Sequence, residues 1–337
     1  MEQASLDVRS SMFWIMLLRG TGAFLVDSAM QKLLKCGVAG VGHLGQSHAR
    51  IYSELDGCEL VGVFDVDDDR AHEIADRYKC AVFGSIEELG NNCDCVSVVT
   101  PTDRHAEVAI PLIECNCHLL IEKPLTSTSS DAERIMQAAA GRDKILQVGL
   151  IEHYNPVFKF LESTVVSPKF ITSQRLASFN VRGTEVGVVL DLMIHDIGVV
   201  LKLVKSDVTS IDAVGVSVLS NNEDIANARL HFANGCVADL NASRVSEKKL
   251  REIRVFQPYS YLSLDFTSQS GHSIEVTDNG LVHKDVPVEK EEPLKTELMS
   301  FLNCVRKHKE PKIDIHFGKK TLELALKITD IIKDRMM

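Results

Sequence analysis

Two short motifs hold the side chains that removal of hydride from an alcohol requires. Lys123 lies in Glu122-Lys123-Pro124, and Asp191 and His195 follow at i, i+4 spacing further along the chain. Hydride loss from a secondary alcohol needs a group that takes the hydroxyl proton and a charge that stabilises the developing oxygen anion. The Lys123 ammonium can do either, and the His195 imidazole can accept a proton near neutral pH. Which of the two takes the proton is open, and Asp191 is expected to orient His195 or to contact substrate hydroxyls.

A glycine-rich segment before these motifs is typical of a dinucleotide site. Gly40-Val41-Gly42-His43-Leu44-Gly45 directly follows an apolar run and opens a predicted helix. In this pattern the first glycine makes a tight turn, the second lets the backbone approach a pyrophosphate, and the third lets the helix pack on the strand. The free N–H groups at the helix N-terminus can bind the phosphates. The segment therefore predicts the phosphate-binding part of the site.

Asp65 indicates which dinucleotide is expected. It ends the next predicted strand, 20 residues after Gly45. A carboxylate at that place can accept hydrogen bonds from both ribose hydroxyls, and it repels a 2′-phosphate. No arginine directly follows Asp65, and the next one along the chain is Arg70, which could still reach the adenine side. We therefore expect NAD, with NADP less favoured.

Alternating strands and helices must position these residues. Apolar runs at 33–40, 59–64, 81–83, 95–99, 118–121 and 145–148 alternate with predicted helices at 43–55, 69–78, 86–89, 104–114 and 130–140. Such alternation predicts a doubly wound parallel sheet of the Rossmann type. Ligands bind these sheets at the carboxyl ends of the strands, where Thr100, His105 and Lys123 fall.

The pattern changes near residue 150. A predicted helix at 188–204 precedes period-2 runs that include 210–219, 227–232, 236–243 and 251–256, and helices at 291–308 and 317–333 end the chain. Period-2 runs indicate a mostly antiparallel open sheet with one apolar face. The expected fold class is α/β, with a Rossmann domain over 33–150. An α+β domain over 151–337 is expected to bind substrate and form oligomers, and its last helix could pack back on the Rossmann domain.

Composition excludes several classes of function. The 337 residues are 45% hydrophobic and 25% charged, which is typical of a soluble globular protein. The net charge of −10 argues against a general affinity for nucleic acid or anionic membranes. Nine scattered cysteines without a Cys-x-x-Cys pair predict no metal site and fit the reducing cytoplasm. Residues 1–32 match no part of the pattern and hold no run long enough to span a bilayer, so we expect an appendage, an over-called start or a peripheral helix.

Three motifs in order resemble the Gfo/Idh/MocA oxidoreductase family. They are Thr100-Pro101-Thr102-Asp103-Arg104-His105, His118-Leu119-Leu120-Ile121-Glu122-Lys123-Pro124-Leu125, and the Asp-x-x-x-His pattern in Gly187-Val188-Val189-Leu190-Asp191-Leu192-Met193-Ile194-His195-Asp196. The resemblance extends from about residue 35 to the end of the chain. It implies that the cofactor contacts the glycine loop, Asp65, Thr100, Pro101, Thr102, His105, Glu122 and Lys123. It also implies catalysis by Lys123, His195 and Asp191, and a homodimer or homotetramer.

A fourth segment is similar to one branch of that family, which oxidises the 3-hydroxyl of UDP-N-acetylglucosamine with NAD. The segment is Val148-Gly149-Leu150-Ile151-Glu152-His153-Tyr154-Asn155-Pro156, and His153 stands where that branch usually carries arginine. The similarity implies that the substrate contacts Lys123, His153, Tyr154, Asn155, Asp191 and His195. The expected function is therefore NAD-dependent oxidation of a sugar hydroxyl, on a nucleotide sugar similar to UDP-N-acetylglucosamine.

Two alternatives stay open. The first keeps the fold and the reaction and changes the substrate to a free sugar, inositol or another cyclic polyol. The second is a non-catalytic regulator that senses NAD, and the presence of Lys123, Asp191 and His195 together argues against it.

Overall fold

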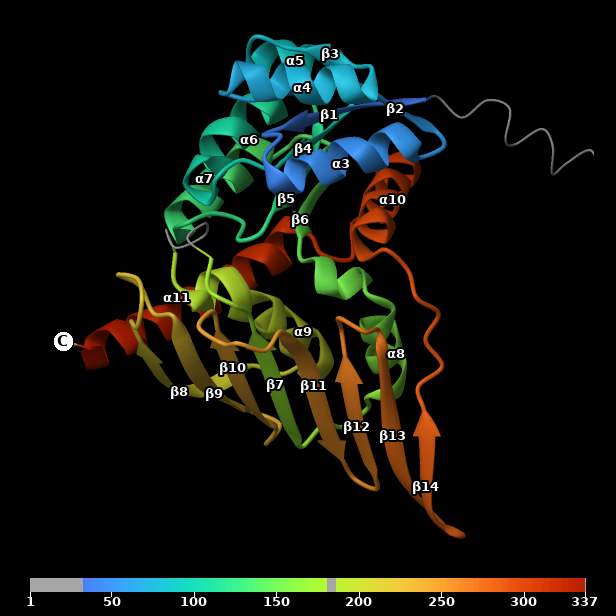
Figure 1. The fold of residues 1–337 in the computed structure, drawn as a ribbon, viewed down its shortest axis with the longest axis vertical. Coiled ribbons are helices and arrows are strands. Elements are labelled where there is room, and N and C mark those ends of the chain that lie inside the picture. Colours follow the sequence, from blue (N-terminus) through green and yellow to red (C-terminus); the bar gives the residue numbers. More distant parts are fainter. Residues whose placement is uncertain (1–32, 181–185, 337) are drawn as a thin grey trace, which may run out of the picture.

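The chain forms two sheets, one above the other in Figure 1, with helices between and around them. The computed structural model describes residues 33–180 and 186–336, so the expectation for residues 1–32 lies outside the described residues. The parallel sheet belongs to the amino-terminal half, and the larger sheet belongs to the carboxy-terminal half. This arrangement confirms the expected fold class.

The first sheet has six parallel strands in the order β3-β2-β1-β4-β5-β6. Its strands are β1 (Leu34–Ala39), β2 (Cys58–Phe64), β3 (Ala81–Val82), β4 (Cys95–Val98), β5 (His118–Glu122) and β6 (Leu146–Gly149). Its helices are α3 (His43–Glu54), α4 (Asp68–Tyr78), α5 (Ile86–Asn92), α6 (His105–Glu114) and α7 (Ser129–Ala139). The side chains of Asp67, Ser85 and Thr128 accept backbone N–H groups at the starts of α4, α5 and α7, which explains why these helices begin there.

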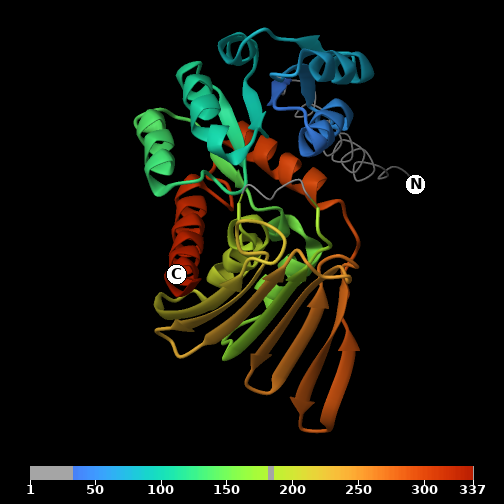
Figure 2. The same ribbon diagram turned by 60° about the vertical axis from the view of Figure 1, so that its left-hand side comes forward.

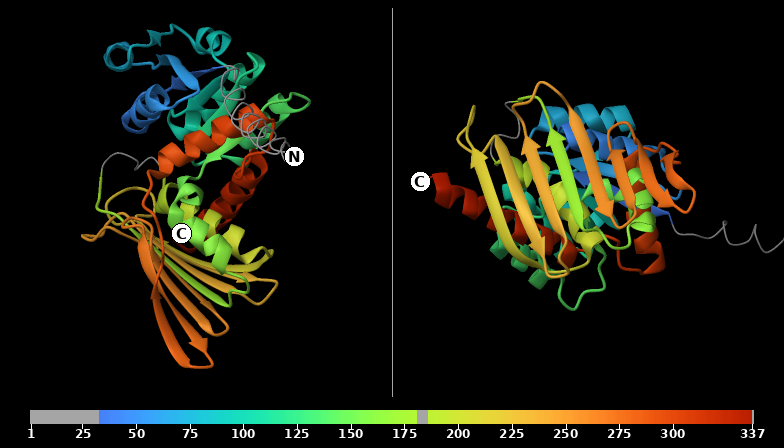
Figure 3. Two further views of the ribbon diagram at one scale, coloured as in Figure 1. Left: turned by 90° about the vertical axis from the view of Figure 1, so that its right-hand side faces the viewer. Right: turned by 90° about the horizontal axis from the view of Figure 1, so that it is seen from below.

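The second sheet has eight strands in the order β14-β13-β12-β11-β7-β10-β9-β8. They are β7 (Phe170–Leu176), β8 (Val208–Val216), β9 (Ile225–Phe232), β10 (Val237–Ser243), β11 (Leu250–Gln257), β12 (Ser260–Asp265), β13 (Ser270–Thr277) and β14 (Gly280–Asp285). Neighbouring strands are antiparallel except for the central pair of β7 and β10, which runs parallel. Helices α8 (Pro156–Thr164) and α9 (Ile194–Val204) pack on one face. Seen from below, the strands lie in front of the helices, so the described helices leave the other face uncovered (Figure 3).

The last two helices connect the halves. Helix α10 (Pro293–Lys307) packs on α3, and its buried Leu298 and Phe301 belong to the same apolar core as Val38 and Tyr52 (Figures 1 and 2). Helix α11 (Ile315–Met336) contacts α7 and β6 of the first half and β8 and α9 of the second. The carboxy-terminal segment therefore packs on both sheets.

The helix that carries Asp191 and His195 differs from the continuous helix expected over 188–204. It begins as a π-helical turn, Val189–Met193, and continues as α9 from Ile194. The Ile194 N–H donates to the Val189 carbonyl, an i→i+5 bond. Interactions from outside the helix account for the change: the Glu223 carboxylate accepts the Val189 N–H at 3.3 Å, and the Asp191 carbonyl accepts a bond from Lys123 at 2.8 Å.

Candidate active site

The glycine loop lies at the carboxyl end of β1 with the geometry of a phosphate cradle. Gly40 has a φ of +88°, and a Cβ atom there would lie 2.6 Å from the carbonyl oxygen of Val99. A Cβ atom at Gly45 would collide with the Gly40 carbonyl oxygen, whereas a Cβ atom at Gly42 would meet nothing within 4 Å. Helix α3 has no side-chain cap at its N-terminus. Open space therefore adjoins uncapped N–H groups, in a segment where His43 and Leu44 are exposed.

A cavity of about 670 Å³ opens beside this loop. Gly40, Gly42, Asp65, Thr100 and Pro101 line it, with Phe64, Val66, Arg70, Val99, Arg104, Glu107 and Val108. The Asp65 carboxylate accepts the Val41 N–H at 2.7 Å and the Asp67 N–H at 3.0 Å, and Arg70 lies 3.6 Å from it. Asp65 thus fixes the glycine loop as well as lining the cavity, and it has acceptor capacity left because a carboxylate offers about four lone-pair sites.

His105 joins the loops that follow β4 and β5. Its ring is buried, with Nε2 3.0 Å from the Thr100 carbonyl and Nδ1 3.0 Å from the Pro124 carbonyl and 3.1 Å from the Leu125 carbonyl. Burial lowers the pKa of His105. The Thr100 hydroxyl is also buried and has no hydrogen-bond partner among the described residues. Thr102 begins a 3₁₀ turn beside this loop and does not line the cavity.

Lys123 lies between the two halves of the molecule. Its ammonium donates to Asp191 Oδ1 at 2.9 Å and to the Asp191 carbonyl at 2.8 Å. The Glu122 carboxylate accepts the Lys123 backbone N–H at 3.1 Å and lies 3.2 Å from His48 Nε2. Glu122 lines neither of the cavities described in this section. It positions the backbone of Lys123 instead.

His195 lies in the first turn of α9, after the π-helical turn of Asp191. Its ring is largely buried and its Nδ1 has no hydrogen-bond partner in the described part of the chain. Burial lowers the pKa of His195 well below its usual value, and the positive charges of Arg175, Lys123 and Arg251 lower it further. His195 is therefore a neutral imidazole near pH 7, although it is not among the side chains that line the neighbouring cavity.

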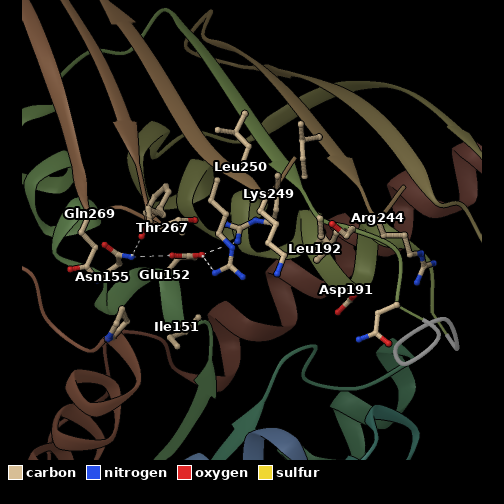
Figure 4. Close-up of a pocket in the computed structure, with 18 residues that line it drawn as sticks. Ile151, Glu152, Asn155, Asp191, Leu192, Arg244, Lys249, Leu250, Thr267 and Gln269 are labelled. Carbon is tan, nitrogen blue, oxygen red and sulfur yellow. Dashed lines mark hydrogen bonds and ion pairs between the residues drawn. The ribbon is translucent and has the colours of Figure 1, made fainter. Parts of the chain in front are cut away.

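A second cavity, of about 600 Å³, lies on the side of the large sheet and is lined by Asp191, the partner of Lys123, whereas Lys123 itself is not among its lining residues (Figure 4). Glu152, Asn155, Asp191, Arg244, Lys249 and Arg251 give it a polar lining. It shares no lining residue with the cavity at the glycine loop. The two cavities are linked through the loop after β5, because His105 ties Thr100 to that loop and Lys123 ties the loop to Asp191.

The comparisons with known proteins agree with this geometry. Residues 34–150 match the model of the oxidoreductase family with an NAD-binding Rossmann fold, and residues 167–257 match the GFO/IDH/MocA C-terminal domain. The chain belongs to the Gfo/Idh/MocA oxidoreductase family. This confirms the family and the dehydrogenase class that the motifs predicted.

Relatives of this Gfo/Idh/MocA oxidoreductase include a nucleotide-sugar dehydrogenase and an inositol dehydrogenase. The chain is 34% identical over 302 residues to the UDP-N-acetylglucosamine 3-dehydrogenase of Acidithiobacillus ferrooxidans, covering 88% of this chain and 96% of that one. A solved structure of that enzyme has a TM-score of 0.86 at 33% identity and covers 90% of this chain and 99% of its own. The scyllo-inositol 2-dehydrogenase (NAD(+)) of Bacillus subtilis is 24% identical over 338 residues, covering 91% and 96%.

The first cavity of this oxidoreductase fits the cofactor of its family, NAD or NADP. Three observations support the fit: the open space at Gly42, the uncapped start of α3 and the unpartnered hydroxyl of Thr100. In the described part of the chain no group of three or more His, Cys, Asp or Glu side chains is arranged to hold a metal ion. No helix in residues 33–180 and 186–336 is long and apolar enough to cross a membrane.

Of the three neighbouring residues that were expected to contact the sugar, His153, Tyr154 and Asn155, only one lines the second cavity. Asn155 lines it, but His153 packs edge-on against Phe158 and Phe317, with ring centroids 4.6 and 5.7 Å apart. Tyr154 is also buried outside the cavity. Residues 151–154 form a 3₁₀ turn, in which residues three apart share a side, so Glu152 and Asn155 face the cavity. We do not carry His153 and Tyr154 into the proposed substrate site.

A buried ionic network beside helix α9 was not expected from sequence. Arg175 on β7 lies 2.8 Å from Glu152 and 2.8 Å from Asp196, and the Ser173 hydroxyl donates to Asp196 at 2.9 Å. All four side chains are buried. Alternation along β7 and the position of Asp196 beside His195 were the available signals, but pairing across 21 and 23 residues is not visible in a pattern.

Proposed function

We propose that this oxidoreductase uses NAD to oxidise the 3-hydroxyl of a nucleotide sugar similar to UDP-N-acetylglucosamine. The observation that carries the proposal is the Lys123–Asp191 pair, in which Lys123 directly follows β5 of the Rossmann half and Asp191 lines the polar cavity of about 600 Å³. The 34% identity over 88% of the chain to a UDP-N-acetylglucosamine 3-dehydrogenase supports this substrate over a free polyol.

Lys123 and His195 divide the chemistry in this proposal. The Asp191 carboxylate holds the Lys123 ammonium in place, where its charge stabilises negative charge that develops on the substrate oxygen. His195, which burial keeps neutral, accepts the hydroxyl proton as the C–H bond breaks and the C=O bond forms. Bound NAD would accept the hydride. Thr100 and His105 hold the cofactor loop against the loop of Lys123, so both partners are positioned by one connected set of contacts.

The preference for NAD over NADP is part of the proposal. Asp65 lies at the end of β2 with its side chain 6% exposed and lines the cofactor cavity. Arg70 is paired with Asp65 and, at 2.7 Å, with Asp67, so its charge is already compensated. A 2′-phosphate would meet the Asp65 carboxylate without a free arginine beside it.

A substrate panel tests the proposed function. Formation of NADH is followed by absorbance with NAD and either UDP-N-acetylglucosamine, N-acetylglucosamine or myo-inositol. We expect kcat/KM to be highest for UDP-N-acetylglucosamine. A higher value for myo-inositol would support the polyol alternative, and no turnover together with tight NAD binding would support the regulator alternative.

We also propose that the uncovered face of the large sheet pairs with a second copy of the chain in a homodimer or homotetramer. Phe256 is 37% exposed on that face, where it stacks on Phe170 at a centroid distance of 5.7 Å and lies tilted against Tyr261 at 4.8 Å. Val214 and Val216 on β8 are 53% and 51% exposed. An apolar face on a sheet of this size marks an interaction surface.

The nine free cysteines support a reducing compartment, and we propose the cytoplasm.

A further inference from the structure

The cavity of about 600 Å³ that Asp191 lines has more positive than negative charge in its lining. Four cationic side chains, Arg175, Arg244, Lys249 and Arg251, line it together with only two anionic ones, Glu152 and Asp191. The whole chain carries a net charge of −10, so this local excess runs against the overall balance. Positive charge that is concentrated in one cavity of a negatively charged chain indicates that the cavity binds a negatively charged ligand.

Two of the four cations already have dedicated partners. Arg175 is buried between Asp196 and Glu152. Arg244 is buried against Asp224 at 3.0 Å, and it donates to the Val186 carbonyl at 2.7 Å. These two arginines therefore hold the protein together and do not have a charge to offer a ligand.

Lys249 and Arg251 are different because they are exposed and weakly compensated. The side chain of Arg251 is 53% exposed, and its ion pair is with Glu152 at 3.5 Å, a carboxylate that Arg175 also contacts at 2.8 Å. Lys249 is exposed and forms no ion pair or hydrogen bond with any residue of 33–180 and 186–336. Positive charge from these two side chains is available to a molecule in the cavity.

The strand geometry directs both side chains to the same side. Lys249 directly precedes β11 and Arg251 is the second residue of that strand, and side chains two residues apart along an extended chain point to the same side. Ile253 and Val255 continue the series and are buried, so this is the face toward the helices. Figure 4 shows Lys249 extending into the cavity between Glu152 and Asp191.

The ligand that fits these cations is not the cofactor. The phosphates of a dinucleotide belong at the glycine loop, whose cavity shares no lining residue with this one. A neutral sugar or polyol does not require two uncompensated cations, and a cavity of about 600 Å³ is much larger than one six-membered ring needs. A sugar that carries a diphosphate matches both the charge and the space.

We propose that Lys249 and Arg251 form a diphosphate-binding subsite that selects a nucleotide sugar over a free sugar or polyol. The proposal rests on the proposed function and deepens it: Lys123 and Asp191 hold the sugar ring that reacts, while Lys249, just before β11, and Arg251, at its start, hold the diphosphate that does not react. Such remote contacts position the reacting hydroxyl and lower KM without taking part in proton or hydride transfer.

Steady-state kinetics of three proteins test the subsite: the wild type, the Lys249→Ala/Arg251→Ala double variant and Lys248→Ala. Lys248 is an exposed neighbour outside the cavity lining and serves as the matched control. With saturating NAD, we expect the double variant to raise KM for UDP-N-acetylglucosamine by about 100-fold, because each hydrogen bond to a charged group is worth about tenfold or more. We expect kcat to stay within about threefold, since neither residue holds the reacting atoms. Lys248→Ala should behave as the wild type, and KM for N-acetylglucosamine should be equal in all three.

A binding measurement separates failure of the subsite from failure of the proposed function. Calorimetry with NAD-saturated protein measures the Kd of UDP, which has the diphosphate but no sugar. We expect the same loss of affinity in the double variant, and a Kd that weakens with added salt. Normal turnover with unchanged KM and Kd in the double variant would overturn the subsite alone. UDP binding that depends on Lys249 and Arg251, without turnover of UDP-N-acetylglucosamine by the wild type, would overturn the proposed function and leave the subsite supported. Absence of both would overturn both.

Discussion

Lys123 and Asp191, 68 residues apart in sequence, are joined by two contacts of 2.8 and 2.9 Å from one ammonium group. One residue follows the fifth strand of the parallel sheet, and the other lies in the π-helical turn that starts the helix on the large sheet. The pair therefore connects the two halves of the molecule, and its Asp191 side chain lines the polar cavity on the side of the large sheet.

Replacing Lys123 by alanine should reduce kcat by about 100-fold or more, because general acid–base and charge-stabilising groups contribute factors of this size. The Kd of NAD, measured by calorimetry, should stay within about threefold, since Lys123 is held by Asp191 and not by the glycine loop. Asp191→Asn should cost less than Lys123→Ala, because it keeps the shape of the pair and orients rather than exchanges a proton. Near-normal turnover of Lys123→Ala would contradict the assignment.

The pH dependence should report the low pKa of His195. Burial, with help from Arg175 and Lys123, lowers that pKa well below 6.5, so the imidazole stays neutral and able to accept a proton over the range from pH 8 to pH 6.5. We therefore expect no decrease in kcat/KM as the pH is lowered from 8 to 6.5. The value should fall only below pH 6.5, where His195 becomes protonated. The His195→Ala variant should lose turnover by a factor comparable with Lys123→Ala. An acidic limb centred above pH 6.5 in the wild type would argue against His195 as the proton acceptor.

Asp65→Asn should shift the cofactor preference toward NADP. Asparagine keeps an oxygen that can accept the Val41 N–H, which Asp65 accepts at 2.7 Å, and it removes the charge that repels a 2′-phosphate. Paired calorimetric titrations with NAD and NADP measure the effect, which we expect to be about tenfold in the ratio of the two Kd values, as for one charge-assisted hydrogen bond. Asp68→Asn, at an exposed position of α4, is the control and should change neither value. Tighter binding of NADP by the wild type would overturn the preference.

Glu297→Gln should stabilise the protein at pH 8. Glu297 on α10 is fully buried, its carboxyl oxygens have no partner in the described part of the chain, and burial raises its pKa well above 4.5. Because the pKa of Glu297 is higher in the folded state than in the unfolded state, the full free energy of unfolding is present only below pH 4.5. As the pH rises from 4.5 toward the folded-state pKa, the free energy of unfolding falls by up to about 1.4 kcal/mol per pH unit. The free energy of unfolding in urea should therefore be measured for both proteins at pH 5 and at pH 8. We expect the difference, Glu297→Gln minus wild type, to be larger at pH 8 than at pH 5 by about 1 kcal/mol or more. The exposed substitution Glu310→Gln should show no such gain, and equal pH slopes for Glu297→Gln and the wild type would refute the explanation.

Phe256→Glu should dissociate the proposed oligomer. A carboxylate beside Phe170 and Tyr261 would place an unpaired charge in the sheet face that we expect to be covered. Light scattering at micromolar concentration should give the mass of a single chain for this variant and a dimer or tetramer for the wild type. Val166→Glu adds the same charge at an apolar residue that is 87% exposed outside the sheet, and it should leave the assembly intact. A monomeric wild type would contradict the expectation.

The parallel sheet could be predicted from sequence because its signals are local. Buried apolar runs such as Leu34–Ala39 alternate with helices that start at capping side chains, and the expected boundaries lie within a few residues of those observed. The glycine loop is equally local, since Gly40 and Gly45 meet the steric demands of one turn and Gly42 leaves open space beside it. Patterns of this kind require no knowledge of distant neighbours.

The second half of the site could not be predicted in the same way because its contacts are distant in sequence. Arg175, Asp196 and Glu152 meet from a strand, a helix and a 3₁₀ turn. The direction of His153 depends on that turn, which points it at Phe158 and leaves Glu152 to face the cavity. The π-helical turn of Asp191 likewise depends on partners outside the helix, Lys123 and Glu223.

Helix α10 has a consequence for how the chain is made. Leu298 and Phe301 complete the apolar core that β1 and α3 begin, yet they are separated from those elements by the whole of the large sheet. During synthesis, the apolar surface that α10 covers stays open on the nascent chain until Lys307 has left the ribosome. Chaperones that bind exposed apolar segments have that interval in which to act. The amino-terminal half of the chain is therefore synthesised first, but its apolar core is among the last parts of the fold to be completed.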